Sequence, residues 1–366
     1  MRVVIKVGTS VISLRSGEGL DKEQIRRIAG QVADIRNLGH EVILVSSGAI
    51  GAGMTVLGWK TRPKELRDKQ AAAAVGQVSL MEAYEGAFKP KGLAVAQVLL
   101  TRLDLEDRAR YINARNTLLS LLSFSAVPII NENDTVSTDE IQFGDNDTLS
   151  ALVAVKAEAD LLVILTNVDG FYRKSADPAD GPEVVREIHQ ISSELKKEAR
   201  SEASSELSVG GMRSKLEAAR IVMASGIDMW IVNGRTQGIL NGIIHGTAEG
   251  TRFVAKRSKL GSKKRWIAFG TRAKGQLFVD GGASKAVKQG GKSLLPSGIT
   301  SISGRFQAGD AVSIMDDDSQ EIGRGLCNYS TEELRRIVGR KSREISQILG
   351  RAGSPEVIHR DNLVIL

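Results

Sequence analysis

Val3-Val-Ile-Lys-Val-Gly-Thr-Ser10, close to the start of the chain, joins a β-branched run to a glycine turn. The run over residues 3–7 predicts a strand, and Gly8 lets the backbone after it approach a ligand closely. Lys6 lies within this strand, where burying its ammonium group is costly unless the group meets an anion. The segment therefore indicates a phosphate-handling site at the end of the first strand. A lysine that reaches water from an edge strand is the alternative interpretation.

Short β-branched runs alternate with helical patterns through residues 1–250. One helix is expected after the N-cap Asp21, because isoleucine and valine recur at helical spacing until Gly39. Another is expected from Arg213 to Ser225. The expected strands lie near residues 3–7, 41–46, 93–100, 127–131, 161–166 and 228–232. This alternation is typical of βαβ units around a mainly parallel sheet, so we predict an α/β domain.

The pattern changes after residue 252. Residues 256–265 carry six positive charges in ten positions, which indicates a linker. Short strand candidates separated by glycine turns follow at 276–279, 293–302, 311–314 and 321–326, and a helix is expected at 331–338. We therefore expect a domain over residues 1–252, a basic linker over 253–272 and a compact β-rich domain over 273–366.

Bulk composition narrows the functional class. A chain of 366 residues, 42% of them hydrophobic, exceeds what one hydrophobic core usually serves, so two domains are expected. The longest apolar runs are far shorter than the roughly 20 residues that cross a bilayer, and no signal peptide precedes the first strand. The lone Cys327 cannot form an internal disulfide. We expect a cytoplasmic protein without a membrane partner.

The net charge of +7 is unevenly distributed. Residues 1–251 contain 29 Lys and Arg against 32 Asp and Glu, whereas residues 252–366 contain 21 against 11. The excess positive charge therefore belongs to the C-terminal part. Such a surface suits contact with RNA or another polyanion, and a basic surface that serves only solubility is the alternative.

Two further glycine-rich stretches precede helical patterns. Ser46-Ser-Gly-Ala-Ile-Gly-Ala-Gly53 has the glycine separation of a P-loop, but Met54 stands where the P-loop lysine is required, so a P-loop is excluded. Val209-Gly-Gly-Met-Arg-Ser-Lys215 is a glycine pair that leads into a helix with Lys215 in its first turns. Each is either an anion-binding turn or an ordinary glycine turn.

Two polar clusters lie between these stretches. Asn131-Glu-Asn-Asp134 follows an expected strand directly, and Gly144-Asp-Asn-Asp147 precedes an expected helix. Open α/β sheets bind ligands beyond the carboxyl ends of their strands, which favours a ligand site at the first cluster. A turn combined with a helix N-cap remains the alternative, because Asp and Asn are favoured at both.

Taken in order, these motifs resemble the amino acid kinase family, and within it the branch that phosphorylates the side-chain carboxylate of glutamate. The resemblance is carried by Ile5-Lys-Val-Gly-Thr-Ser10, Ser47-Gly-Ala-Ile50, Ile130-Asn-Glu-Asn-Asp134, Gly144-Asp-Asn-Asp147 and Gly210-Gly-Met-Arg-Ser-Lys215. Residues 273–351 resemble a PUA domain, through Ser293-Leu-Leu-Pro-Ser-Gly298 and Phe306-Gln-Ala-Gly-Asp310. The resemblance implies a three-layer α/β sandwich with a mainly parallel sheet, followed by a small β-barrel-like domain.

The resemblance also implies an activity: ATP and Mg²⁺ serve to phosphorylate L-glutamate, giving glutamyl 5-phosphate, the first step toward proline. In this interpretation Lys6 and Lys215 contact the transferred phosphoryl group, and Asp147 holds both lysines. The implied glutamate site consists of Ser47, Asp134 and Asn146. The implied nucleotide site consists of Lys6, Thr166, Asn167, Val209, Gly210, Gly211, Met212, Arg213, Ser214 and Lys215. No protein ligand is assigned to the metal, proline is implied as a feedback inhibitor, and a homo-oligomer, dimer or tetramer, is implied as the assembly.

Two departures from the family motifs leave the ATP affinity open. The family reads Thr-Asp where this chain has Thr166-Asn167, and its Gly-Thr-Gly-Gly-Met stretch is replaced by Ser208-Val-Gly-Gly-Met212. Two other functions remain alternatives. One is a sibling kinase acting on acetylglutamate, aspartate or a nucleoside monophosphate, and the other is an RNA-binding PUA protein with an inactive kinase domain.

Overall fold

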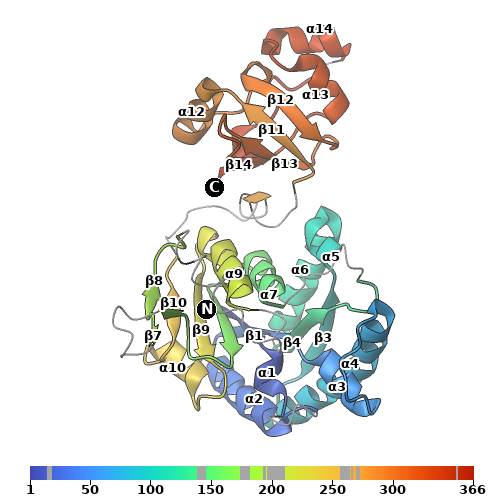
Figure 1. Cartoon of the computed structure of the whole chain (residues 1–366), viewed down its shortest axis with the longest axis vertical. Helices are drawn as coiled ribbons and strands as arrows, with labels where there is room; N and C mark the ends of the chain where they lie inside the picture. Colours follow the sequence, from blue (N-terminus) through green and yellow to red (C-terminus); the bar gives the residue numbers. More distant parts are fainter. Residues whose placement is uncertain are drawn as a thin grey trace. The chain divides into compact units, whose positions relative to one another are not determined.

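The computed structural model describes residues 1–14, 19–137, 146–173, 182–192, 195, 211–255, 264, 267–268, 273–351 and 353–366. The chain divides into two compact units, Met1–Ser258 and Lys259–Leu366, each with its own sheet (Figure 1). Within the described ranges, no helix combines the length and the hydrophobicity needed to span a bilayer.

The first unit is built on an eight-stranded sheet. Its strands are β1 (Arg2–Val7), β2 (Glu41–Ser46), β3 (Val95–Leu100), β4 (Val127–Glu132), β5 (Leu161–Thr166), β8 (Glu187–Ile188), β9 (Asp228–Asn233) and β10 (Thr251–Phe253), in the order β3-β4-β2-β1-β5-β9-β10-β8. All neighbours from β3 to β9 are parallel, and β10 runs antiparallel to β9. A separate small sheet pairs β6 (Tyr172–Arg173) with β7 (Glu183–Val184). The six predicted strands are confirmed, although β3 begins two residues later than expected.

Helices cover both faces of this sheet. They are α1 (Thr9–Ile12), α2 (Lys22–Asn37), α3 (Ala49–Val56), α4 (Leu66–Phe88), η1 (Lys89–Lys91), α5 (Arg102–Glu106), α6 (Arg108–Ser123), α7 (Asn146–Lys156), α9 (Met212–Ala224) and α10 (Ile239–His245). Figure 1 shows α6, α7 and α9 on one face and α2, α3 and α10 on the other. The predicted cap is confirmed, because Asp21 accepts a hydrogen bond from the Gln24 backbone N–H at 3.0 Å. The predicted three-layer α/β sandwich is confirmed.

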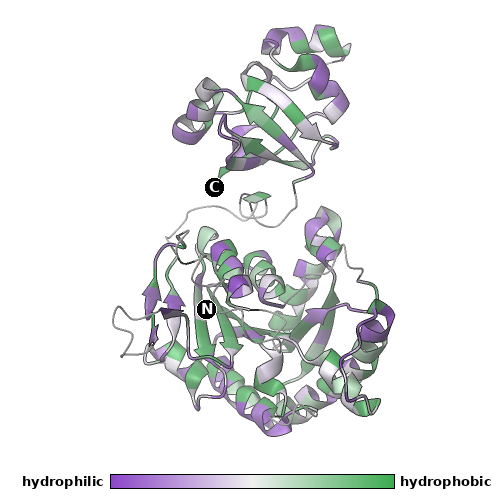
Figure 2. Cartoon of the chain, in the orientation of Figure 1, coloured by the Kyte–Doolittle hydropathy of each residue, from purple (hydrophilic) through white to green (hydrophobic). Residues whose placement is uncertain are grey.

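Strand β1 lies in the middle of the sheet and is covered on both faces, which explains its nearly continuous apolar sequence. Val4 and Ile5 are fully buried, and Figure 2 shows hydrophobic colouring along the central strands. The strand order reverses around β1, because β2 continues the sheet on one side and β5 on the other. Such a reversal is where open α/β sheets place their ligands, beyond the carboxyl ends of the strands.

Helices α3 and α4 touch through their backbones. A Cβ atom added at Gly53 would lie 1.8 Å from the Ala72 carbonyl oxygen, and one added at Gly76 would lie 1.8 Å from that of Ala49. Only glycine fits at either position. Gly48, which caps the start of α3, has a φ of 103°, in the left-handed region that favours glycine. The glycine-rich stretch after β2 is therefore required for the turn and for helix packing.

The second unit is a mixed sheet with the order β12-β11-β13-β14-β15. Its elements are β11 (Gly275–Val279), α12 (Gly281–Gly290), η3 (Pro296–Gly298), β12 (Ile299–Gly304), β13 (Ala311–Met315), β14 (Glu321–Leu326), α13 (Thr331–Ile337), η4 (Ser342–Glu344), α14 (Ile345–Leu349), η5 (Arg360–Asn362) and β15 (Leu363–Ile365). Its hydrophobic core includes Leu277, Val312 and Tyr329 and is distinct from the core of the first unit. The predicted β-rich character is confirmed.

Two expectations for this unit were wrong. The expected strand over residues 293–302 begins only at Ile299, because Pro296 has no backbone N–H to donate and starts a 3₁₀ turn instead. Helix α12 was not expected, although Asp280 caps it by accepting from the Ala283 N–H at 2.7 Å. Most of the expected linker over 253–272 lies outside the described residues, so that boundary stays a prediction.

Candidate active site

Lys6 is positioned by the central strand of the sheet. It lies in register with Val45 on β2 and Ile164 on β5, and only 6% of the residue is exposed. A lysine reaching water from a sheet edge is therefore excluded. The Gly8 N–H donates to the Leu165 carbonyl at 3.1 Å, and a Cβ at Gly8 would lie 3.6 Å from the Lys6 Nζ atom. Glycine thus leaves space beside the ammonium group.

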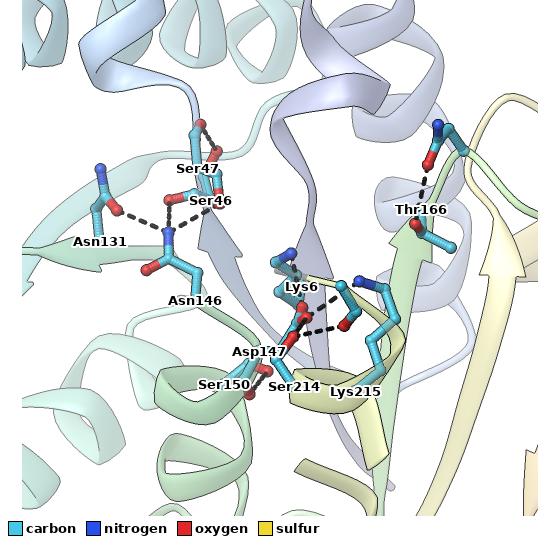
Figure 3. Close-up of polar contacts among 12 residues, drawn as sticks. Lys6, Ser46, Ser47, Asn131, Asn146, Asp147, Ser150, Thr166, Ser214 and Lys215 are labelled. Atoms are coloured by element: carbon cyan, nitrogen blue, oxygen red, sulfur yellow. Dashed lines mark hydrogen bonds and ion pairs between the residues drawn. The ribbon is translucent and has the colours of Figure 1, made fainter. Parts of the chain in front are cut away.

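Asp147 forms ion pairs with both lysines. Its side chain is fully buried in the first turn of α7, and Lys6 Nζ lies 2.7 Å from Oδ1 while Lys215 Nζ lies 3.1 Å from Oδ2. The Ser214 hydroxyl donates to Oδ2 at 2.7 Å. Figure 3 shows β1, α7 and α9 supplying these side chains from three directions. Groups from distant parts of the sequence therefore form one charged cluster.

Electrostatics keep the Asp147 carboxyl ionised. Burial by itself would raise its pKa, but the ammonium groups of Lys6 and Lys215, with hydrogen bonds from Lys6 and Ser214, lower the pKa to about 2. Within the described residues, both ammonium groups therefore converge on a single ionised carboxylate. Two ammonium groups held side by side in this way are suited to oxygens of a phosphate group.

The start of α9 brings the glycine stretch to the cluster. Helix α9 begins at Met212 with Gly211 as its N-cap, and Ser214 Oγ lies 2.9 Å from the Gly211 carbonyl oxygen. Arg213 is exposed to solvent. The first N–H groups of a helix and its dipole favour an anion at this end. The candidates Val209 and Gly210 lie outside the described residues.

The end of β5 carries the other candidate nucleotide residues. Thr166 is buried, and its hydroxyl donates to the Asn167 carboxamide oxygen at 3.4 Å, while Asn167 itself is exposed. Asp169, two residues further on, accepts hydrogen bonds at 2.9 Å from Asn233 Nδ2 and from the Tyr172 hydroxyl. The neutral Asn167 thus faces solvent, and the nearby carboxylate is engaged within the protein.

Asn146 and Ser47 meet on the other side of β1. Asn146 Nδ2 lies 2.9 Å from Ser47 Oγ, 2.9 Å from the Ser46 carbonyl oxygen and 3.0 Å from Asn131 Oδ1 (Figure 3). Asn131 is buried and donates onward to Gln77 Oε1 at 3.0 Å. Asn131 belongs to a sequence motif, but no role was predicted for it. Gln77 was not predicted as a site residue, because it lies within an alanine-rich helix outside every motif.

Asp134 follows β4 by two residues and is half-buried. Burial raises its pKa to about 6, and the neighbouring Glu132 carboxylate adds to the rise. Within the described part of the chain, no hydrogen bond links Asp134 to Ser47 or Asn146. Its raised pKa indicates a carboxylate that an arriving cation would stabilise.

A parallel sheet whose strand order reverses beside two lysines on one carboxylate is the arrangement expected of a phosphoryl-transferring enzyme. Residues 1–233 match the Amino acid kinase family and residues 275–349 match the PUA domain. The chain therefore belongs to the amino acid kinase family and carries a PUA domain. The resemblance inferred from the motifs is confirmed.

Similarity to individual relatives extends over the whole chain. The chain is 48% identical to the glutamate 5-kinase of Thermoanaerobacter sp. (strain X514) and 47% identical to that of Cupriavidus metallidurans (strain ATCC 43123 / DSM 2839 / NBRC 102507 / CH34), over 100% of this chain and 98% of each relative. A solved structure of isopentenyl phosphate kinase matches with a TM-score of 0.47 and 17% identity, over 69% of this chain and 100% of that one.

Proposed function

We propose that this chain transfers the γ-phosphoryl group of ATP to the side-chain carboxylate of L-glutamate, forming glutamyl 5-phosphate and ADP in the first step toward proline. The end-to-end similarity to glutamate 5-kinases supports the choice of substrate. The observation that carries the proposal is the placement of Lys6 and Lys215 on opposite oxygens of Asp147, beside the polar group of Ser47 and Asn146.

The chemistry needs charge stabilisation more than proton transfer. A glutamate side chain has a pKa near ~4.3, so it is already an anionic nucleophile at neutral pH and requires no general base. Its attack on a polyanionic phosphate is opposed by electrostatic repulsion. Lys6 and Lys215 offset that repulsion at the oxygens where charge accumulates, and Asp147 fixes the spacing of the two ammonium groups.

Mg²⁺ belongs to the proposal as a partner of the nucleotide. Bound to the phosphates, it would neutralise part of their charge. Among the described residues no group of three or more His, Cys, Asp or Glu could hold a metal, and both Asp147 oxygens are engaged by lysines. We assign the metal to the phosphate oxygens of ATP and to no protein side chain.

The amino acid would be bound on the β2 and β4 side of β1. Ser47 and Asn146 are suited to its polar groups, and Asp134 is suited to its ammonium group. An ammonium group beside Asp134 would reverse the effect of burial on the pKa of that carboxyl. The nucleotide would be bound on the β5 side, by Thr166, Asn167 and residues 209–215.

Regulation, assembly and location complete the proposal. Proline would act as a feedback inhibitor, and the chain would function in the cytoplasm as a homo-oligomer. An open cavity of about 870 Å³ between α4 and the edge strand β3, with Val78 62% exposed in its lining, offers a surface for such assembly.

An acceptor panel tests the proposed reaction. Purified chain, ATP and Mg²⁺ are incubated with L-glutamate, acetylglutamate, aspartate or UMP, and ADP release is followed. Hydroxylamine is added in parallel to convert an acyl phosphate into a coloured hydroxamate. Glutamate should give the highest kcat/KM and a hydroxamate. A higher kcat/KM with any other acceptor, or no turnover at all, would refute the proposal.

A further inference from the structure

A chain of side-chain hydrogen bonds connects helix α4 to the proposed glutamate site. Asn131 Nδ2 donates to Gln77 Oε1 at 3.0 Å, Asn146 Nδ2 donates to Asn131 Oδ1 at 3.0 Å, and Asn146 Nδ2 also lies 2.9 Å from Ser47 Oγ. Helix α4, strand β4, the start of α7 and the turn between β2 and α3 each contribute one residue to it. We call the set Gln77, Asn131, Asn146 and Ser47 the amide relay.

The direction of the relay is fixed at two backbone groups. The Glu132 backbone N–H donates to Asn131 Oδ1 at 2.9 Å, and the Ser46 carbonyl accepts from Asn146 Nδ2 at 2.9 Å. A backbone N–H can only donate and a carbonyl can only accept, so neither carboxamide can exchange its oxygen and nitrogen without losing a bond. The orientation of both amides therefore follows from the main chain.

The same logic fixes Gln77. Because Asn131 presents its NH₂ group, Gln77 must present its oxygen, and this leaves Gln77 Nε2 buried without a partner among the described residues. A buried donor without an acceptor is destabilising. A residue of this kind is retained at a cost in stability, which is typical of a position that serves function.

At the proposed glutamate site, the relay leaves two groups of opposite polarity. The two N–H groups of Asn146 are shared among acceptors on Ser47, Asn131 and Ser46, and its carboxamide oxygen accepts no bond from any described residue (Figure 3). Ser47 Oγ accepts from Asn146, so its hydroxyl hydrogen is left to donate. An acceptor beside a donor matches the ammonium and carboxylate groups of an α-amino acid.

We propose that Gln77 and Asn131 are positioning residues that set this polarity, so that Asn146 Oδ1 joins Asp134 in receiving the substrate ammonium group and the Ser47 hydroxyl donates to its α-carboxylate. The proposal rests on the proposed function for the identity of the amino acid. Removing the Gln77 oxygen leaves the buried Asn131 NH₂ group without an acceptor, and the carboxamide that orients Asn146 is then released.

The test compares Gln77→Leu, which removes the acceptor, with Gln77→Glu, which keeps an oxygen facing Asn131. The control is Glu85→Leu, a similar loss of polarity on the same helix; both Gln77 and Glu85 line the cavity between α4 and β3. Gln77→Leu should raise the KM for L-glutamate about tenfold, with kcat and the KM for ATP within twofold of wild type. Gln77→Glu and Glu85→Leu should both stay within twofold throughout.

A specificity ratio separates positioning from a structural effect. Glutarate is glutamate without its ammonium group, so the preference for glutamate over glutarate in kcat/KM should fall about tenfold in Gln77→Leu alone. An unchanged glutamate KM in that variant, equal rises in both substrate KM values, or a Gln77→Glu variant that behaves like Gln77→Leu would overturn the relay. Thermal unfolding midpoints of all variants, with and without glutamate, report folding and binding independently of turnover.

Wild-type turnover of glutamate is measured first, because it tests the proposed function independently of the amide relay. If another α-amino acid proves to be the acceptor, the same KM ratios are taken with that acceptor, and the relay is judged on them. An acceptor without an α-ammonium group would overturn the relay together with the proposed function.

Discussion

Lys6 on β1 and Lys215 on α9 face each other across the Asp147 carboxylate, at 2.7 Å from Oδ1 and 3.1 Å from Oδ2. One buried anion thus holds two cations at a fixed spacing before any substrate arrives. Such preorganisation is effective in catalysis because the protein does not have to reorganise while charge develops in the transition state.

Lys215→Ala should lower kcat by about 10²–10³, because it removes one of the two charges that stabilise the migrating phosphoryl group. Steady-state kinetics with ATP and glutamate measure the effect. The fold should persist, because Lys6 still neutralises Asp147. Lys215→Arg is the matched control and should recover part of the rate. A near-normal kcat in Lys215→Ala would remove Lys215 from the mechanism.

Asp147→Asn should destabilise the protein at neutral pH by about 3–5 kcal/mol, because it leaves two buried ammonium groups without their counterion. The pKa of Asp147 is about 2 in the folded protein and near ~3.9 when unfolded, so its stabilising contribution is present above pH ~4 and is lost as the pH falls toward 2. Denaturant unfolding curves of wild type and variant should therefore converge between pH 4 and pH 2. A constant difference over that range would contradict the assignment.

Asp134 should make glutamate binding pH-dependent near neutrality. Its pKa of about 6 means that acidification below pH 6 neutralises the carboxylate that would receive the substrate ammonium group. The KM for glutamate should rise as the pH falls from 7 to 5, while the KM for ATP changes little. An unchanged glutamate KM across that range would exclude Asp134 from substrate binding.

Asp134→Asn should stabilise the empty enzyme at pH 7 while weakening glutamate binding. Because the folded pKa exceeds the unfolded value, the ionised carboxylate costs stability that grows as the pH rises from about 4 to 6. After discounting for partial exposure, the gain at pH 7 is about 1 kcal/mol. Thermal melts of both proteins at pH 4 and pH 7 measure it, and equal differences at the two values would be the contrary result.

Gly76→Ala should destabilise the first unit by about 3 kcal/mol or more, because the added Cβ would lie 1.8 Å from the Ala49 carbonyl oxygen and 2.3 Å from the Gly53 nitrogen. Gly86→Ala on the same helix is the control. No atom lies within 4 Å of its added Cβ, and alanine should there increase stability by about 0.5–1 kcal/mol. Chemical denaturation distinguishes the two, and similar effects would contradict close packing of α3 and α4.

A chain ending at Ser258 should fold and phosphorylate glutamate, because the hydrophobic cores of the two units share no residue. Circular dichroism and ADP release measure both properties, and loss of either would show that the units depend on each other. Filter binding at physiological salt, comparing the full chain with the truncated one, tests RNA as a partner. Specific retention of RNA by the full chain alone would favour the alternative function.

Much of the fold could be predicted because strand patterns and caps are local signals. The apolar run of β1 and the Asp21 cap of α2 are written in neighbouring residues, and both were found. Helix α12 was missed because it opens with Gly281 and Gly282, which predict a turn. The prediction of a strand over residues 293–302 did not take Pro296 into account. Proline has no backbone N–H to donate to a sheet, and this too is a local signal.

The site could be predicted only as far as its motifs extend. Lys6, Asp147 and Lys215 were singled out by sequence and lie together, whereas the contact between Asn131 and Gln77 was not anticipated. A hydrogen bond between two amides separated by many residues leaves no periodic trace in the sequence. The roles proposed for these side chains remain predictions that the experiments above decide.

The reversal of strand order around β1 separates the candidate site residues into two groups, one on each half of the sheet. Ser47, Asn131 and Asn146 lie on one side of Lys6, and Thr166 and Lys215 lie on the other (Figure 3). Under the proposed function, substitutions that change the acceptor would fall on one half and those that change ATP binding on the other. A fold of this kind would allow the specificity for the phosphoryl acceptor to change while the phosphoryl donor stays the same.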